Sequence, residues 1–148
     1  MKDVNIYIYT QFHGTLSNGS GKAHIIWETM IKDEKGKEIP FTKKRQFEYK
    51  DVTKNRLELL ALKEALLKMR KKSRITIYMD SQYVVSAISN GWLDTWAESG
   101  FIKKGKAIRH AELWRDIETE IEKHEVLLIQ GKTEYTKIQE FELKGEGV

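Results

Sequence analysis

Two carboxylates occupy positions that are unusual for ordinary surface acids. Glu58 shares one face of a predicted helix with Leu62, Ala65 and Met69, at spacings of four, seven and eleven residues. That face should look inward. An unpaired buried carboxylate is costly, so a metal ion, a cation or a hydrogen-bond network should compensate it. The alternative is that Glu58 only lies near the helix start, where the helix dipole stabilises an acid. Position alone does not separate the two.

Asp80 is the second carboxylate. It follows a hydrophobic segment, residues 75–79, and precedes a predicted helix. Ligands of α/β folds collect at the carboxyl ends of strands, which favours a functional role. Taken alone, an Asp in this place is more typical of a residue at or near a helix N-cap.

The elements that must position these acids are read from hydrophobic periodicity. Strands are predicted at residues 4–9, 23–31 and 41–49, with a turn-rich stretch at 14–21. Further along, helices and strands alternate: helices at 57–70, 81–89, 93–98, 111–123 and 136–143, and strands at 74–79 and 126–129. This order predicts an α/β fold, a mixed sheet covered by helices.

Composition sets wider bounds. A chain of 148 residues fits one domain with a real hydrophobic core. No apolar run is long enough to span a bilayer, and no secretory leader is visible, so we expect no membrane partner and a cytoplasmic location. The net charge of +4 permits a nucleic-acid partner, but by itself it is weak evidence for one.

Several sequence blocks together resemble the type 1 RNase H (RNase HI) family. They are TKNRLEL at 53–59, DSQYV at 80–84, NGWLDTW at 90–96, GFIKKGK at 100–106 and AELW at 111–114. The resemblance implies one RNase H-like domain over residues 1–148. Its expected sheet has five strands, an antiparallel meander followed by parallel strands, with helices on both faces.

The resemblance also implies a chemistry. Members of the family hold two Mg²⁺ ions, or Mn²⁺, on four carboxylates and cleave the RNA strand of RNA–DNA hybrids. Glu58 matches the second acid and Asp80 the third. Gln11 stands in place of the first acid when the chain is aligned on Tyr9-Thr10, and His13 when it is aligned on Gly14-Thr15. Glu142, or with less support Glu140, is the candidate for the fourth.

The missing first acid predicts weak or absent hydrolysis. Replacing a carboxylate between two dications with an amide removes several kcal/mol of attraction, roughly a thousandfold or more in rate. One ion would remain, held loosely by Glu58 and Asp80, or none. The retained pair Glu58 and Asp80 instead favours an active metal-dependent ribonuclease H with Glu142 recruited. A protein-binding scaffold on the same fold is the third alternative.

The residues implied to bind nucleic acid are better preserved. By resemblance, sugar and phosphate contacts fall on Asn18, Thr53, Asn55 and Gln82, and a protruding basic handle on Trp92, Lys103, Lys104 and Lys106. We therefore expect a monomer that binds RNA–DNA hybrid or duplex, with a protein partner as an alternative. Trp96 is expected to pack into the core rather than bind. His110 and His124 are expected at the surface near helix ends.

Overall fold

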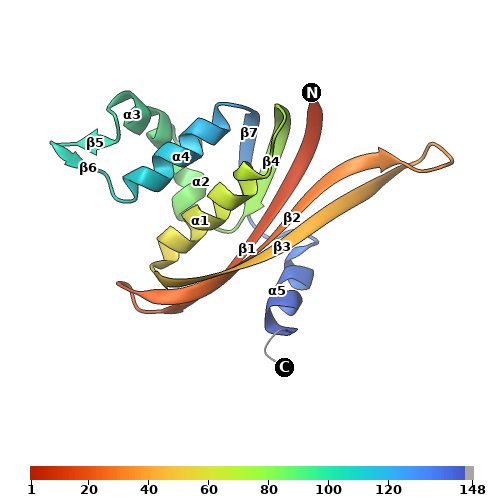
Figure 1. Cartoon of the computed structure of the whole chain (residues 1–148), viewed down its shortest axis with the longest axis horizontal. Coiled ribbons are helices and arrows are strands. Elements are labelled where there is room, and N and C mark those ends of the chain that lie inside the picture. The colour runs from red at the N-terminus through yellow and green to blue at the C-terminus, as the bar shows by residue number, and fades with distance from the viewer. Residues whose placement is uncertain (146–148) are drawn as a thin grey trace.

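The protein is described by a computed structural model covering residues 1–145, and it is built on one five-stranded sheet (Figure 1). The strands are β1 (Lys2–Gly14), β2 (Gly19–Lys32), β3 (Glu38–Val52), β4 (Ser73–Met79) and β7 (Glu125–Gln130). Their order is β3-β2-β1-β4-β7. The first three pair antiparallel, whereas β4 lies parallel to β1 and β7 parallel to β4. The predicted meander followed by parallel strands is confirmed.

Helices lie on both faces of this sheet (Figure 1). They are α1 (Lys54–Leu67), α2 (Gln82–Ser89), α3 (Trp92–Glu98), α4 (Ala111–Ile121) and α5 (Thr136–Gly145). The first four cover one face, and α5 packs against β1 and β2 on the other. Two short strands, β5 (Ile102–Lys103) and β6 (Lys106–Ala107), pair as a hairpin that projects from the helical side. The sequence prediction did not include this hairpin as strands.

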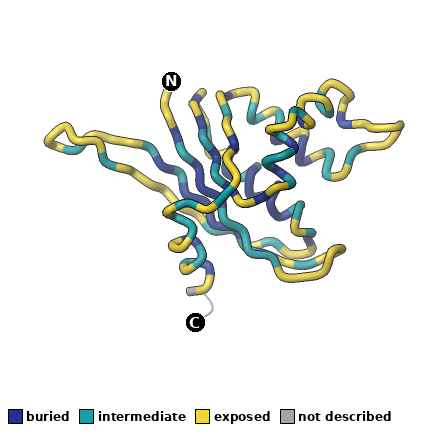
Figure 2. The backbone as a smooth tube through the Cα atoms, turned by 180° about the vertical axis from the view of Figure 1, so that it is seen from behind, coloured by how far each residue is buried: buried dark blue, intermediate teal, exposed yellow. Residues whose placement is uncertain are grey.

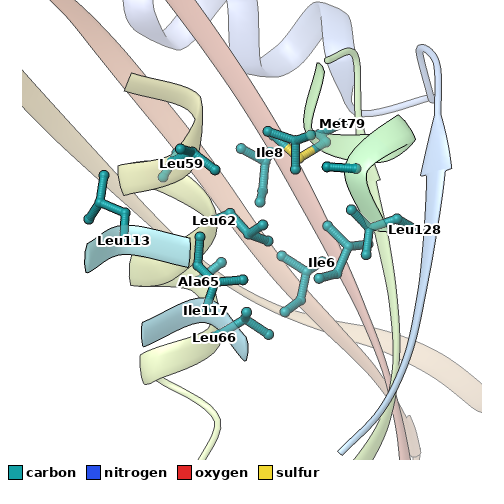
Figure 3. Close-up of a cluster of buried hydrophobic side chains, with 14 of the residues drawn as sticks. Ile6, Ile8, Leu59, Leu62, Ala65, Leu66, Met79, Leu113, Ile117 and Leu128 are labelled. Carbon is teal, nitrogen blue, oxygen red and sulfur yellow. The ribbon is translucent and has the colours of Figure 1, made fainter. Parts of the chain in front are cut away.

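The core lies between the sheet and α1. Alternate residues of β1, such as Ile6 and Ile8, point to this side and meet Leu62 and Leu66 of α1, while Ile117 reaches in from α4 (Figure 3). Strand alternation and the helical repeat therefore deliver apolar side chains to one shared layer. The inward face of α1 predicted from spacing is confirmed.

A polar network fastens the opposite face. The Glu28 carboxylate accepts hydrogen bonds from the Asn5 amide (3.0 Å), the Tyr7 hydroxyl (3.1 Å) and the Tyr135 hydroxyl (2.5 Å). Burial raises the pKa of Glu28, but these three donors outweigh it and leave the pKa below its usual range. Gln139 of α5 donates to two backbone carbonyls of β1 and β2, each at 3.0 Å. Side chains far apart in sequence thus hold α5 on the sheet.

The start of α1 is set by two local features. The Thr53 hydroxyl accepts a hydrogen bond from the Arg56 N–H at 3.2 Å, which caps the helix. The helix therefore begins at Lys54, three residues before its predicted start. At Gly21 of β2, a Cβ would lie 2.5 Å from the Leu57 side chain. This glycine lets the first turn of α1 approach the sheet closely and brings the neighbouring Glu58 to it.

Candidate functional site

Glu58 lies in the second turn of α1 and is buried, with 3% of its surface exposed. Its Oε2 atom has no hydrogen-bond partner among the described residues. The pKa of the Glu58 carboxyl is raised above its usual value, mainly because burial disfavours the charged form. A hydrogen bond from Ser81 and the charge of Lys54 lower this pKa, and the charge of Asp80 raises it, but burial dominates. The predicted inward orientation is confirmed, and the carboxylate is incompletely compensated.

Asp80 comes directly after β4, at the carboxyl end of that strand, and is exposed. The helix-cap role belongs to its neighbour: the Ser81 hydroxyl accepts a hydrogen bond from the Val84 N–H at 3.2 Å. Asp80 therefore lies next to the N-cap, as the alternative interpretation allowed, but it is not the capping residue. Sequence reasoning missed Ser81, although a serine directly before an apolar helix is a cap signal.

Gln11 lies in β1, opposite Lys22 of β2. Ile8 faces the core side, so strand alternation directs Gln11 and His13 to the α5 side of the sheet. Both line a pocket of about 290 Å³ together with Lys22 and Glu48. Either alignment of the first strand therefore puts a neutral amide or an imidazole, not a carboxylate, on this side of β1.

Glu142 is engaged elsewhere. One carboxylate oxygen lies 2.9 Å from Nε2 of His24 on β2. The other forms a short ion pair with Lys44 on β3. The Lys44 and His24 contacts lower the pKa of Glu142. Glu140 pairs with Lys144 at 3.1 Å. The structure thus places the candidate fourth acid against two basic side chains.

The oxygen ligands available to a metal are consequently few. Within residues 1–145, no group of three His, Asp or Glu side chains is arranged to hold a metal ion. The unpartnered Oε2 of Glu58 and the exposed carboxylate of Asp80 are hard oxygen donors suited to Mg²⁺ or Mn²⁺. These residues fit one ion, not the two-ion set implied by resemblance.

Three of the residues implied to contact nucleic acid lie close to this pair along the chain. Thr53 and Asn55 lie at the N-terminal end of α1, and Gln82 is the exposed first residue of α2. Glu58 comes three residues after Asn55 in α1, and Asp80, at the end of β4, comes two residues before Gln82. Asn18 lies apart, in the β1–β2 turn, where its N–H donates to the Thr15 hydroxyl.

The projecting β5–β6 hairpin carries the predicted basic handle. Lys103, Lys104 and Lys106 are all exposed there, as the yellow tip in Figure 2 shows. Trp92, at the start of α3, is 46% exposed. Trp96 instead packs against the buried Trp114, with ring centroids 5.4 Å apart, which confirms its predicted packing role.

Two histidines were expected at the surface near helix ends; both lie near the ends of α4, but His124 is buried and His110 is only half-exposed. His124 is only 8% exposed, and its Nδ1 accepts a hydrogen bond from the Ser73 N–H at 3.1 Å. His110 precedes α4 and lies half-buried beside Arg56, with its Nε2 atom buried. Burial lowers the pKa of each imidazole. Both side chains join elements distant in sequence, which local periodicity does not reveal.

The family model for RNase H matches residues 4–132. A Ribonuclease H of Clostridium botulinum is 35% identical over 85 residues, 57% of this chain and 57% of that protein. The matched part therefore spans little more than half the length of this curated relative.

No helix within residues 1–145 is long and apolar enough to cross a membrane.

Solved structures with the same fold are also similar. The crystal structure of LC9-RNase H1, a type 1 RNase H with the type 2 active-site motif, superposes with a TM-score of 0.78 at 20% identity. That match covers 99% of this chain and 72% of the other. A foamy viral protease-reverse transcriptase in complex with RNA/DNA hybrid has a TM-score of 0.72 at 16% identity, covering 95% of this chain and 19% of the other.

Proposed function

The chain belongs to the RNase H family, and we propose that it binds RNA–DNA hybrid or duplex nucleic acid while hydrolysing it weakly or not at all. The observation that carries this proposal is the composition of the site. The resemblance assigns the second and third acids to Glu58 of α1 and to Asp80 after β4, whereas Gln11 stands in β1 where it implies an acid.

Binding is supported by groups on two separate parts of the surface. The exposed lysines of the β5–β6 hairpin offer three positive charges to a phosphate backbone. The N-terminal ends of α1 and α2 offer hydroxyl and amide side chains and the positive ends of the helix dipoles, which suit sugar and phosphate oxygens. The foamy viral neighbour, which has the same fold, was captured on an RNA/DNA hybrid.

Weak hydrolysis is supported by the charge at the site. A bound Mg²⁺ or Mn²⁺ ion would supply Lewis-acid stabilisation of the phosphate oxygens. Glu58 and Asp80 would hold it with two carboxylates in total, and the burial of Glu58 adds a desolvation cost. Without a further acid from β1, a second ion has little to bind. We therefore expect catalysis to fall by roughly a thousandfold or more relative to a full carboxylate set.

An active enzyme remains the competing function, and one observation favours it. Glu58 keeps a buried oxygen with no protein partner, and Asp80 stays exposed beside it, as a working metal site requires. Relatives such as the Clostridium botulinum protein are named Ribonuclease H.

The deciding experiment is cleavage of a labelled RNA–DNA hybrid with Mg²⁺ or Mn²⁺, with binding scored on the same samples. Wild type would be compared with Asp80→Asn and Gln11→Asp. Binding without cleavage is the expected result for wild type and for Gln11→Asp alike, because Gln11 faces the α5 side of the sheet whereas Glu58 lies on the α1 side. Cleavage by wild type that Asp80→Asn abolishes would overturn the proposal in favour of a working ribonuclease. Loss of both binding and cleavage would point to the protein-binding scaffold.

A further inference from the structure

A second basic surface lies at the far end of α1 from Glu58. It is a groove of about 860 Å³ between the C-terminal end of α1 and the outer parts of β2 and β3. Lys43, Arg45, Lys68, Arg70 and Phe41 are among its lining residues. Ten residues, or about 15 Å along the axis of α1, separate Glu58 from Lys68 at the groove.

The strand register explains why the groove is basic. Phe41, Lys43 and Arg45 alternate along β3 and pair with Thr29, Trp27 and Ile25 of β2, so they face the same side of the sheet as α1. The Trp27 Nε1–H donates to the Ala65 carbonyl at 3.0 Å, which fixes one wall of the groove to the helix. Strand and helix thus present their cations to one concave surface.

Most of the charge on this surface has no ion-pair partner among the described residues. Seven Lys or Arg residues and no Asp or Glu line the groove. Lys44 pairs with Glu142 on the other face, but in the part of the chain that the structure describes no ion pair engages Lys43, Arg45, Lys68 or Arg70. The dipole of α1 favours a cation at Lys68, yet it does not account for those on β3. Clustered like charges repel, so a bound polyanion would relieve them.

We propose that this groove binds single-stranded nucleic acid, at a site separate from the one that contacts a duplex. The lysine and arginine side chains of the groove would bind the phosphates of the strand. Phe41, 47% exposed at the rim, and the neighbouring Met69 would take an unstacked base. A duplex hides the faces of its bases, so an exposed aromatic ring beside cations favours a single strand. The groove volume lies within the range of about 300–1,000 Å³ typical of ligand pockets.

The test compares two variants that each remove three charges. Lys43→Gln/Arg45→Gln/Arg70→Gln alters the groove, and Lys103→Gln/Lys104→Gln/Lys106→Gln alters the β5–β6 hairpin. Binding of fluorescent oligo(dT) and of an RNA–DNA hybrid would be measured by anisotropy across a salt series. Thermal unfolding would confirm that both variants are folded.

The groove variant should bind oligo(dT) at least tenfold more weakly at low salt, with a log–log salt slope smaller by about 2, because three phosphate contacts are lost. Its hybrid affinity should stay within about twofold of wild type, whereas the hairpin variant should show the reverse pattern. Phe41→Ala should weaken oligo(dT) binding with little change in slope. Because hybrid binding is followed in parallel, failure of the groove proposal is distinguishable from failure of the duplex-binding function.

Three outcomes would overturn the proposal. Equal loss of oligo(dT) binding in both variants would mean diffuse attraction to the whole surface. Unchanged binding in the groove variant would exclude the site. Tighter binding of poly-glutamate than of oligo(dT), lost in the groove variant, would assign the groove to an acidic protein segment.

Discussion

Glu58→Gln should stabilise the metal-free protein at neutral and alkaline pH. The Glu58 carboxylate is buried, one of its oxygens has no partner, and its pKa is raised. The folded state therefore holds the proton more tightly than the unfolded chain does. As pH rises above the ordinary value of 4.5, the folded state must carry an unfavourable buried charge, and stability falls. Glutamine has nearly the same shape and no charge, so it removes this penalty.

The size of the effect follows from the charge alone, because the glutamine amide would leave a polar atom unpartnered in the same place. A buried unpartnered group costs about 1–3 kcal/mol when neutral and more when charged, and we take the excess for the charge to be of similar size, about 1–3 kcal/mol. In a chain of this length, each kcal/mol shifts the melting temperature by about 3 °C. The variant should therefore melt about 3–9 °C above wild type near pH 8. Near pH 4, where the acid is largely protonated in both states, the difference should vanish.

Thermal unfolding followed by circular dichroism in EDTA would measure this, with the exposed Glu98→Gln as the matched control. Added Mg²⁺ should then raise the melting temperature of wild type and not of Glu58→Gln, because only the carboxylate binds the ion. A variant that is less stable than wild type near pH 8 without metal would refute the reasoning. It would mean that neighbouring groups compensate the carboxylate fully.

Three further predictions concern the rest of the fold. Gln139→Ala should cost about 2–4 kcal/mol and speed hydrogen exchange in α5, because two buried carbonyls lose their donor; unchanged exchange would show that other contacts hold the helix. Trp114→Ala, at a fully buried ring, should cost about 3–5 kcal/mol in urea unfolding, and a loss under about 1 kcal/mol would contradict the packing described. The pKa of Glu118 is raised to about 7 by burial and then by nearby acids, so stability should fall between pH 4.5 and 7. Glu118→Gln should flatten that fall by about 1 kcal/mol after allowance for solvent screening, and an unchanged pH profile would exclude the shift.

Features that depend on local periodicity were predictable from the sequence. The inward position of Glu58 follows from its spacing to Leu62 and Ala65, and the individual strands of the β1–β3 meander follow from alternating patterns bounded by turns. The packing of Trp96 follows in the same way. Each of these conclusions needs only the geometry of one helix or strand, which a single sequence carries.

Features that join distant segments were not predictable in this way. Glu142 meets His24 across 118 residues, and His124 meets Ser73 across 51. No spacing rule links such pairs. The β5–β6 hairpin was not predicted because strands of two residues are too short to show an alternating pattern of polar and apolar side chains. The basic groove was also invisible, since its cations come from β3 and the end of α1 and meet only in the folded sheet.

The central place of β1 has a consequence during synthesis. β1 pairs early with β2, which follows it along the chain, but its other edge pairs with β4, about 70 residues later. Until β4 emerges from the ribosome, the backbone N–H and C=O groups along that edge of β1 lack their native partners. Unpaired apolar edges invite intermolecular pairing. The nascent chain should therefore be most prone to aggregation, and most dependent on chaperones, between the completion of the β1–β3 meander and the arrival of β4.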